Sequence, residues 1–108
     1  MDTSAQVAYE LDRAEAARRN GNEGQARVCA RRAAGIAARD FLSRRGVRAE
    51  TQSAYQVLQS LATLPGLDAD LRQAALYLTT RVSATFELPV DVDLIAEARR
   101  LCTALAAA

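Results

Sequence analysis

The chain has 108 residues, a formal net charge of +1 and no histidine. This length predicts one domain, spanning residues 1–108. The near-zero charge argues against a general polyanion binder, and the lack of histidine removes Ser-His-Asp catalysis, Cys-His catalysis and most zinc sites.

Two long helices are expected in the first half of the chain. Thr3 and Ser4 can cap a first helix that reaches about residue 20, with apolar residues at helical spacing. The sequence NGNEG at residues 20–24 then predicts a tight helix–helix turn. A second helix, from about residue 23 to 45, ends with arginines in its last turn and Gly46 just beyond.

Three more helices are expected in the second half. Thr51 or Ser53 starts a third, which runs to about residue 63, before the Leu-Pro-Gly sequence of residues 64–66. Asp68 caps a fourth, which extends to about Thr85 and is broken by ELPV at residues 87–90. Asp91 or Asp93 caps a fifth, from about residue 94 to the C-terminus. The sequence therefore predicts an all-α fold, a compact antiparallel bundle of four main helices plus a short fifth helix.

The second helix is predicted to have two faces, at about 100° per residue. One is an apolar seam of Ala26, Cys29, Ala30, Ala33, Ile36, Ala37 and Phe41. The other carries Arg31, Arg32, Gly35, Arg39 and Leu42. A glycine in mid-helix costs about 1 kcal/mol relative to alanine, so Gly35 indicates a close approach by another helix or a ligand. We predict an outward face here, with Gly35 and Leu42 at an interface, and an ion pair between Asp40 and Arg44.

The arginines of this helix are the main candidates for binding. Residues 11–48 contain ten arginines against four acidic residues. Guanidinium groups can hold phosphate through two parallel hydrogen bonds, so we predict Arg31, Arg32 and Arg39 as ligand-binding residues for a nucleotide or nucleic acid. The same groups can instead solvate the helix or pair with acids of a protein partner. All basic residues are arginine, which also fits coding in a GC-rich genome.

Other chemistry is sparse. Cys29 and Cys102 lie among apolar neighbours without metal-binding spacing, and we expect both to be buried free thiols. There is no glycine-rich phosphate loop, no metal-binding set and no serine with a candidate base, so we predict no cofactor, no catalytic residue and no enzymatic activity. No apolar run approaches the roughly 18 residues of a membrane span, and no signal peptide is evident, so a soluble cytoplasmic protein is expected.

The order of segments resembles a known family. A tight turn precedes the alanine-rich helix of residues 23–45, and SAYQVLQSL at residues 53–61 stands where that family has a short histidine-led helix. Pro89 and EARRL at residues 97–101 match its last turn and helix. Residues 5–105 are thus similar to the HEPN family (higher eukaryotes and prokaryotes nucleotide-binding). The resemblance implies a four-helix-type bundle, frequent homodimerisation, and a role as partner or substrate-binding subunit of a nucleotidyltransferase.

The ribonucleases of that family carry an R-x4-6-H motif near the fourth helix. Here Arg81 is followed by Phe86, Glu87 and Leu88 at the positions of the histidine, so nuclease activity is not implied. A degenerate ribonuclease that uses Arg81 and Glu87 is a minor alternative. The leading prediction is a non-catalytic binding or interaction module that forms a homodimer or joins a protein partner.

A second resemblance gives an alternative of another class. The stretch from residue 14 to 33, with its turn at residues 20–24, is similar to one tetratricopeptide unit. Arrays of such units need about three copies to bury their faces, and no second copy follows at a period near 34. The alternative is therefore a tetratricopeptide-like helical adaptor, with a single hairpin of that kind, that binds a protein or peptide.

Overall fold

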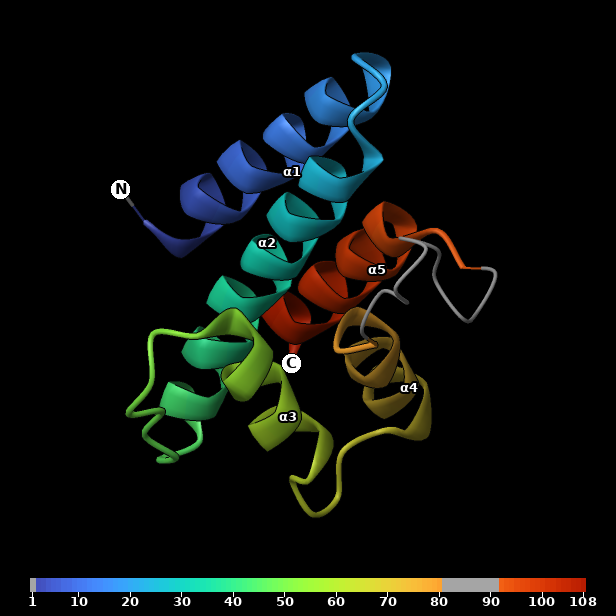
Figure 1. Ribbon diagram of the computed structural model, residues 1–108. Helices are drawn as coiled ribbons and strands as arrows, with labels where there is room; N and C mark the ends of the chain where they lie inside the picture. Colours follow the sequence, from blue (N-terminus) through green and yellow to red (C-terminus); the bar gives the residue numbers. More distant parts are fainter. Residues whose placement is uncertain (1, 81–91) are drawn as a thin grey trace.

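The computed structural model describes residues 2–80 and 92–108, and these ranges form five α-helices and no strand (Figure 1). The helices are α1 (Thr3–Arg19), α2 (Glu23–Arg44), α3 (Ala54–Ala62), α4 (Ala69–Leu78) and α5 (Leu94–Ala107). The all-α prediction is confirmed. The short helices are α3 and α4, with 9 and 10 residues, whereas the fifth helix has 14.

Every helix starts at a polar side chain that accepts a hydrogen bond from a backbone N–H of the first turn. The prediction of Thr3 and Ser4 as caps of α1 is wrong, because Asp2 accepts from the backbone N–H of Ala5 at 2.7 Å. Asp68 caps α4 as expected. Of the paired alternatives, Ser53 caps α3 and Asp93 caps α5, while Asp91 lies outside the described residues.

The fourth helix is shorter than predicted. It ends at Leu78 rather than near Thr85, with Thr79 as its C-cap. The hydroxyl of Thr79 donates to the carbonyl of Ala75 at 3.1 Å, and that of Thr80 donates to the carbonyl of Leu76 at 3.0 Å. Side-chain bonds of this kind compete with continuation of the helix. The predicted break at residues 87–90, together with Arg81 and residues 86–88, lies outside the described residues.

Helix α2 lies at the centre and is covered by α1, α3 and α5 (Figure 1). The predicted seam is buried, with Ile36 only half-buried. The prediction of an outward face is wrong for Gly35 and Leu42, because α3 lies against that side and Leu42 is only 1% exposed. A Cβ on Gly35 would come within 2.6 Å of the Ala54 Cβ. The close approach that Gly35 indicated is therefore made by a helix of the same chain.

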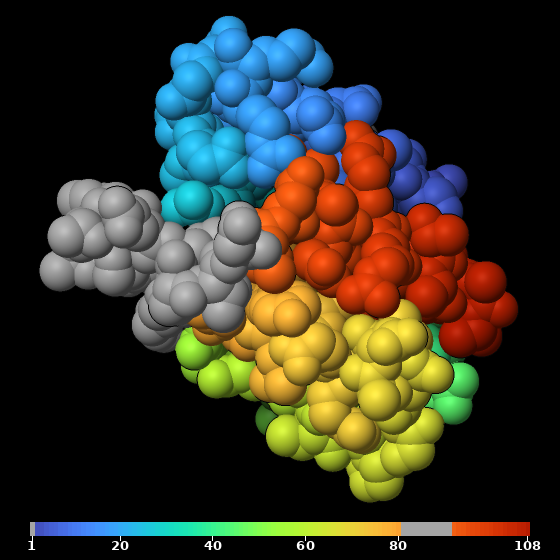
Figure 2. All heavy atoms as spheres, turned by 90° about the vertical axis from the view of Figure 1, so that its right-hand side faces the viewer, coloured from blue at the N-terminus to red at the C-terminus, as the bar shows by residue number. Residues whose placement is uncertain are grey.

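Helices α2 and α5 run parallel, and an arginine holds each end of the pair. At the start of both helices, Arg18 forms ion pairs with Glu23 at 2.8 Å and Asp93 at 2.9 Å. At the end of both helices, Arg44 donates to the carbonyls of Leu105 and Ala108, each at 2.8 Å. Seen from the side, α5 fills the space between the α1–α2 hairpin and the α4 region (Figure 2).

Candidate functional site

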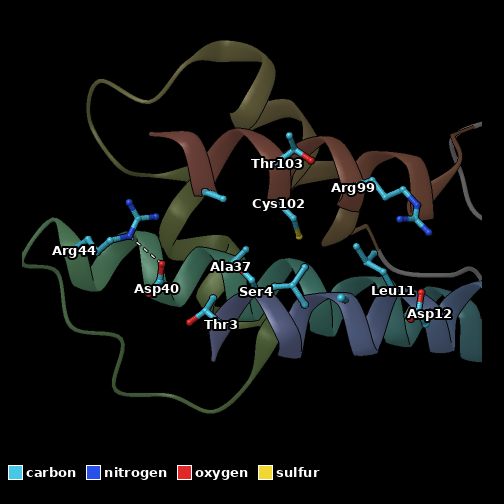
Figure 3. Close-up of a pocket in the computed structure, with 13 residues that line it drawn as sticks. Thr3, Ser4, Leu11, Asp12, Ala37, Asp40, Arg44, Arg99, Cys102 and Thr103 are labelled. Carbon is cyan, nitrogen blue, oxygen red and sulfur yellow. Dashed lines mark hydrogen bonds and ion pairs between the residues drawn. The ribbon is translucent and has the colours of Figure 1, made fainter. Parts of the chain in front are cut away.

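A cleft of about 330 Å³ lies between α1 and α5, and α2 forms its floor (Figure 3). We call it the α1–α5 groove. Most of its lining is apolar or small, which is typical of a surface that receives an apolar group. Its lining residues are Thr3, Ser4, Val7, Ala8, Leu11 and Asp12 of α1, Ala37, Asp40 and Arg44 of α2, and Arg99, Cys102, Thr103 and Ala106 of α5.

The two ends of the α1–α5 groove differ in their charged groups. At one end the predicted pair of Asp40 and Arg44 is confirmed at 2.9 Å, and the same guanidinium also holds the carbonyls at the end of α5. Asp12 and Arg99 lie at the other end (Figure 3). Within residues 2–80 and 92–108, the carboxylate of Asp12 has no hydrogen-bond or ion-pair partner, and the guanidinium of Arg99 has only a 3.4 Å contact with Glu15. This end therefore carries two charges of opposite sign that remain open to a ligand.

A thiol lies inside the α1–α5 groove. The Sγ of Cys102 points into the cleft, and the residue is 7% exposed (Figure 3). Burial raises the pKa of this thiol to about 11, so it is neutral at physiological pH and a weak nucleophile. Cys29 is fully buried elsewhere, where its sulfur accepts a hydrogen bond from Gln25. Both cysteines are buried free thiols, as predicted.

A second depression, of about 530 Å³, lies along the other side of α1, between it and the start of α3. We call it the polar groove, because both acidic and basic side chains line it. Glu10, only 8% exposed, is paired with Arg13 at 2.9 Å. The lining residues of the polar groove are Thr3, Gln6, Glu10, Arg32, Gly35, Ile36, Arg39, Asp40, Ser43, Gln52 and Ala54.

The three arginines predicted as ligand-binding residues do not form one cluster. Arg31 reaches α4, where its Nε donates to the carbonyl of Leu78 at 2.7 Å. Arg39 donates to the side chain of Gln52 at 3.1 Å and to the carbonyl of Thr51, and so holds the segment before α3. Only Arg32 is exposed. Arg32 and Arg39 share the polar groove, whereas Arg31 does not line it.

Helix capping accounts for part of the arginine excess. Arg31 caps α4, Arg44 caps α5, and Arg72 caps α3 by donating to the carbonyls of Ala62 at 2.8 Å and Leu64 at 3.1 Å. The guanidinium fork suits this task, since it can reach two carbonyls at once and its positive charge faces the negative end of the helix. For Arg31 and Arg44, spacing along α2 cannot reveal these contacts, because α4 and α5 come later in the chain.

The α1–α5 groove was not foreseen from the sequence. One signal was available: Ala5 and Tyr9 give α1 a small and an apolar residue on the side opposite Leu11 and Ala14, and both are exposed. An amphipathic surface helix carries mostly polar residues there. On α1 these two residues stand among the exposed polar residues Gln6, Asp12 and Arg19, so its outer side is only partly polar.

Residues 2–80 and 92–108 contain no group of three or more His, Cys, Asp or Glu residues that could hold a metal ion. None of the helices in these ranges is long and apolar enough to cross a membrane.

Comparison of the chain with protein-family models, with curated proteins and with solved structures gives no match.

Proposed function

We propose that this protein is a non-catalytic interaction module, and that the α1–α5 groove is its docking surface. The observation that carries the proposal is the cleft itself, with apolar lining from Val7, Leu11 and Ala37 and with Asp12 and the weakly paired Arg99 at one end. A groove between two helices suits an amphipathic helix, whose apolar side enters it while polar groups meet the rim. The neutral thiol of Cys102 supplies no activated nucleophile.

The resemblance to the HEPN family supports a narrower form of this proposal. Under it, the chain acts as a homodimer, as a partner or substrate-binding subunit of a nucleotidyltransferase, or as both. The five-helix arrangement with a long central α2 is compatible with that family's bundle. Co-expression with a nucleotidyltransferase from the same genome tests this form, because the two chains should then co-elute.

The groove proposal is tested by blocking the cleft. Ala8 is exposed on its rim, so Ala8→Arg inserts a long charged side chain with little effect on the core. We expect every complex of the protein, with itself or with another chain, to be lost in this variant, as measured by native mass spectrometry. Gln73→Arg is the matched control, because Gln73 is exposed on α4 and lies outside both grooves. Complexes that survive Ala8→Arg, with an unfolding temperature equal to that of the control, contradict the proposal.

A phosphate contact in the polar groove is a second candidate function. Arg32 and Arg39 support it, since both line this groove and guanidinium groups bind phosphate well. Glu10 and Asp40 line the same groove and oppose an anion. Calorimetric titration with inorganic phosphate and with a nucleoside monophosphate tests this candidate. Binding that is abolished by Arg32→Glu supports it, and heat that is unchanged in this variant rejects it.

The tetratricopeptide-like adaptor remains the alternative of another class. The α1–α2 hairpin favours it, because Ala14, Ala26 and Ala30 are fully buried where these two helices meet. The next pair does not repeat the hairpin, since α3 and α4 have 9 and 10 residues against 17 and 22 for α1 and α2. A monomer that binds one specific peptide on the hairpin, and does so equally well after Ala8→Arg, favours the adaptor over the proposed module.

A further inference from the structure

The outer side of α1 is itself suited to enter a groove. Ala5 and Tyr9 are exposed along it, with Ala8 exposed at its edge, and Tyr9 has the largest exposed fraction among the large apolar residues described, 55%. Small residues let another helix approach closely, and a tyrosine can serve as a rigid anchor at low entropic cost. This ridge lies directly beside the α1–α5 groove, because Ala8 belongs to both.

The open charges of the groove are complementary to each other. Asp12 lies on α1 and Arg99 lies on α5, at the same end of the cleft (Figure 3). The weak contact of Arg99 with Glu15, at 3.4 Å between side chains 49% and 35% exposed, leaves most of its donors available. A second copy of the chain brings the same two charges. In a two-fold arrangement, each Asp12 can meet the Arg99 of the other copy, so that the dimer contains two equivalent ion pairs.

We propose that the occupant of the α1–α5 groove is helix α1 of a second copy of this chain. The inference rests on the proposed function and names its partner. In this dimer the two α1 helices lie parallel to each other on either side of the two-fold axis, and α1 of each copy lies in the cleft of the other. Ala5 and Tyr9 of this helix contact the apolar part of the lining, which Val7, Leu11 and Ala37 form. Asp12 approaches Arg99 of the second copy. This arrangement covers both the ridge and the groove. A dimer in which the two grooves face each other would leave the grooves partly empty.

The first measurement is the association state. Sedimentation equilibrium between about 1 and about 300 µM, a range that covers the affinity of ordinary protein interfaces, should show a monomer–dimer equilibrium for the full chain. Ala8→Arg and Tyr9→Ser should each shift this equilibrium toward monomer by about 10-fold or more in Kd. Gln73→Arg should leave it unchanged. A wild-type chain that is monomeric throughout the range overturns the inference.

A charge exchange then tests the specific pairing. In the symmetric dimer, Asp12→Arg makes two Arg–Arg contacts and Arg99→Asp makes two Asp–Asp contacts. Each variant should therefore weaken association by about 100-fold or more. The double variant restores opposite charges and should recover Kd to within a few-fold of wild type. Unfolding temperatures of all three variants show whether the fold is retained, since both residues are exposed. Unchanged association in both single variants contradicts the pairing, as does a double variant that stays monomeric while folded.

Cys102 gives an independent readout of the same groove. Its sulfur lies in the cleft, whereas Cys29 is fully buried and should remain silent. The rate of labelling by a small thiol reagent should fall as the wild-type concentration rises, and should not depend on concentration in Ala8→Arg. A concentration-independent rate in the wild type, together with a dimer by sedimentation, places the dimer contact elsewhere and overturns the inference. If the wild type is monomeric but a different protein protects Cys102, the choice of a second copy is wrong and the proposed module stands.

Discussion

The guanidinium of Arg44 lies 2.8 Å from the carbonyl oxygen of Leu105, which is 61 residues further along the chain. This contact joins the last turn of α2 to the last turn of α5. The Nη1 of Arg44 also donates to the carbonyl of Ala108, and its Nε donates to Asp40. One side chain thus binds two carbonyls at the end of α5, where carbonyls lack the N–H partners of a continuing helix.

Removal of this cap should lower stability. Arg44→Gln loses the bonds to Leu105 and Ala108, and we expect the free energy of unfolding to fall by about 1 kcal/mol, because Arg44 is partly exposed. Chemical denaturation monitored by circular dichroism measures the change. Arg48→Gln is the control, since Arg48 is exposed and has no partner in the described part of the chain. An equal loss of unfolding free energy in both variants would show that the effect comes from the change in net charge rather than from the lost cap.

Adjacent arginines on α2 should respond differently to substitution. Arg31→Gln removes the partly buried bond to the carbonyl of Leu78, so we expect a loss of about 1–2 kcal/mol. Arg32→Gln changes an exposed side chain and should stay within about 0.5 kcal/mol of wild type. Urea denaturation of the two variants makes the comparison at nearly constant net charge. A larger loss for Arg32→Gln would contradict the capping role of Arg31.

Two glycines of α2 should show opposite effects when replaced by alanine. Gly35→Ala places a Cβ 2.6 Å from the Cβ and 2.9 Å from the Cα of Ala54, so α3 must shift, and we expect a loss of about 1–2 kcal/mol. Gly24→Ala meets nothing closer than 3.9 Å and should gain up to about 1 kcal/mol from helix propensity. Thermal unfolding followed by circular dichroism separates the two. Ala54→Gly should partly rescue Gly35→Ala, and the absence of rescue would locate the strain elsewhere.

The ion pairs of Arg18 predict a dependence of stability on acid pH. The hydrogen bond from Arg18 is the main cause that holds the pKa of Glu23 below its usual 4.5. Burial raises the pKa of Asp93, but hydrogen bonds from Arg18 and the Ala96 N–H outweigh it, and the pKa lies below its usual 3.8. Since both pKa values are lower in the folded state, both carboxylates stabilise the fold above about pH 4.5, and this contribution is lost as the pH falls through the folded-state values.

Arg18→Gln should therefore lower the unfolding temperature at pH 7 and have a much smaller effect below about pH 3. Thermal melts across this range make the comparison. Arg19→Gln serves as the control, because Arg19 is exposed and has no partner in the described ranges. If the unfolding temperatures of wild type and Arg18→Gln differ by the same amount at every pH, the ion pairs with Glu23 and Asp93 are not the cause of the difference.

The features that could be predicted from the sequence depend on residues close together in the chain. Asp68 at the start of α4 and Gly46 after α2 are short-range signals, and both stand where expected, with Gly46 at a φ of 77°. The pair of Asp40 and Arg44 is one helical turn apart and follows from spacing alone. The role of Arg31 could not be predicted in this way, because its acceptor, Leu78, is 47 residues away and belongs to a helix whose end was misplaced.

The prediction of an outward face on α2 is wrong for a related physical reason. A surface helix has one solvent-exposed side, but α2 is covered on most sides, and its small residues permit this. Gly35 signalled a close neighbour without identifying it as Ala54. The α1–α5 groove arises from the relative positions of three helices, which periodicity within one helix cannot supply.

The parallel pairing of α2 and α5 also has a consequence for folding kinetics. Contacts of the α1–α2 hairpin are close in sequence, whereas docking α5 at Arg44 closes a loop of about 60 residues, with an entropy penalty on the order of 3–4 kcal/mol. We expect the hairpin to form in the transition state and α5 to dock after it. Substitutions in the hairpin core, such as Ala30→Gly, should then mainly slow refolding, and Arg44→Gln should mainly speed unfolding.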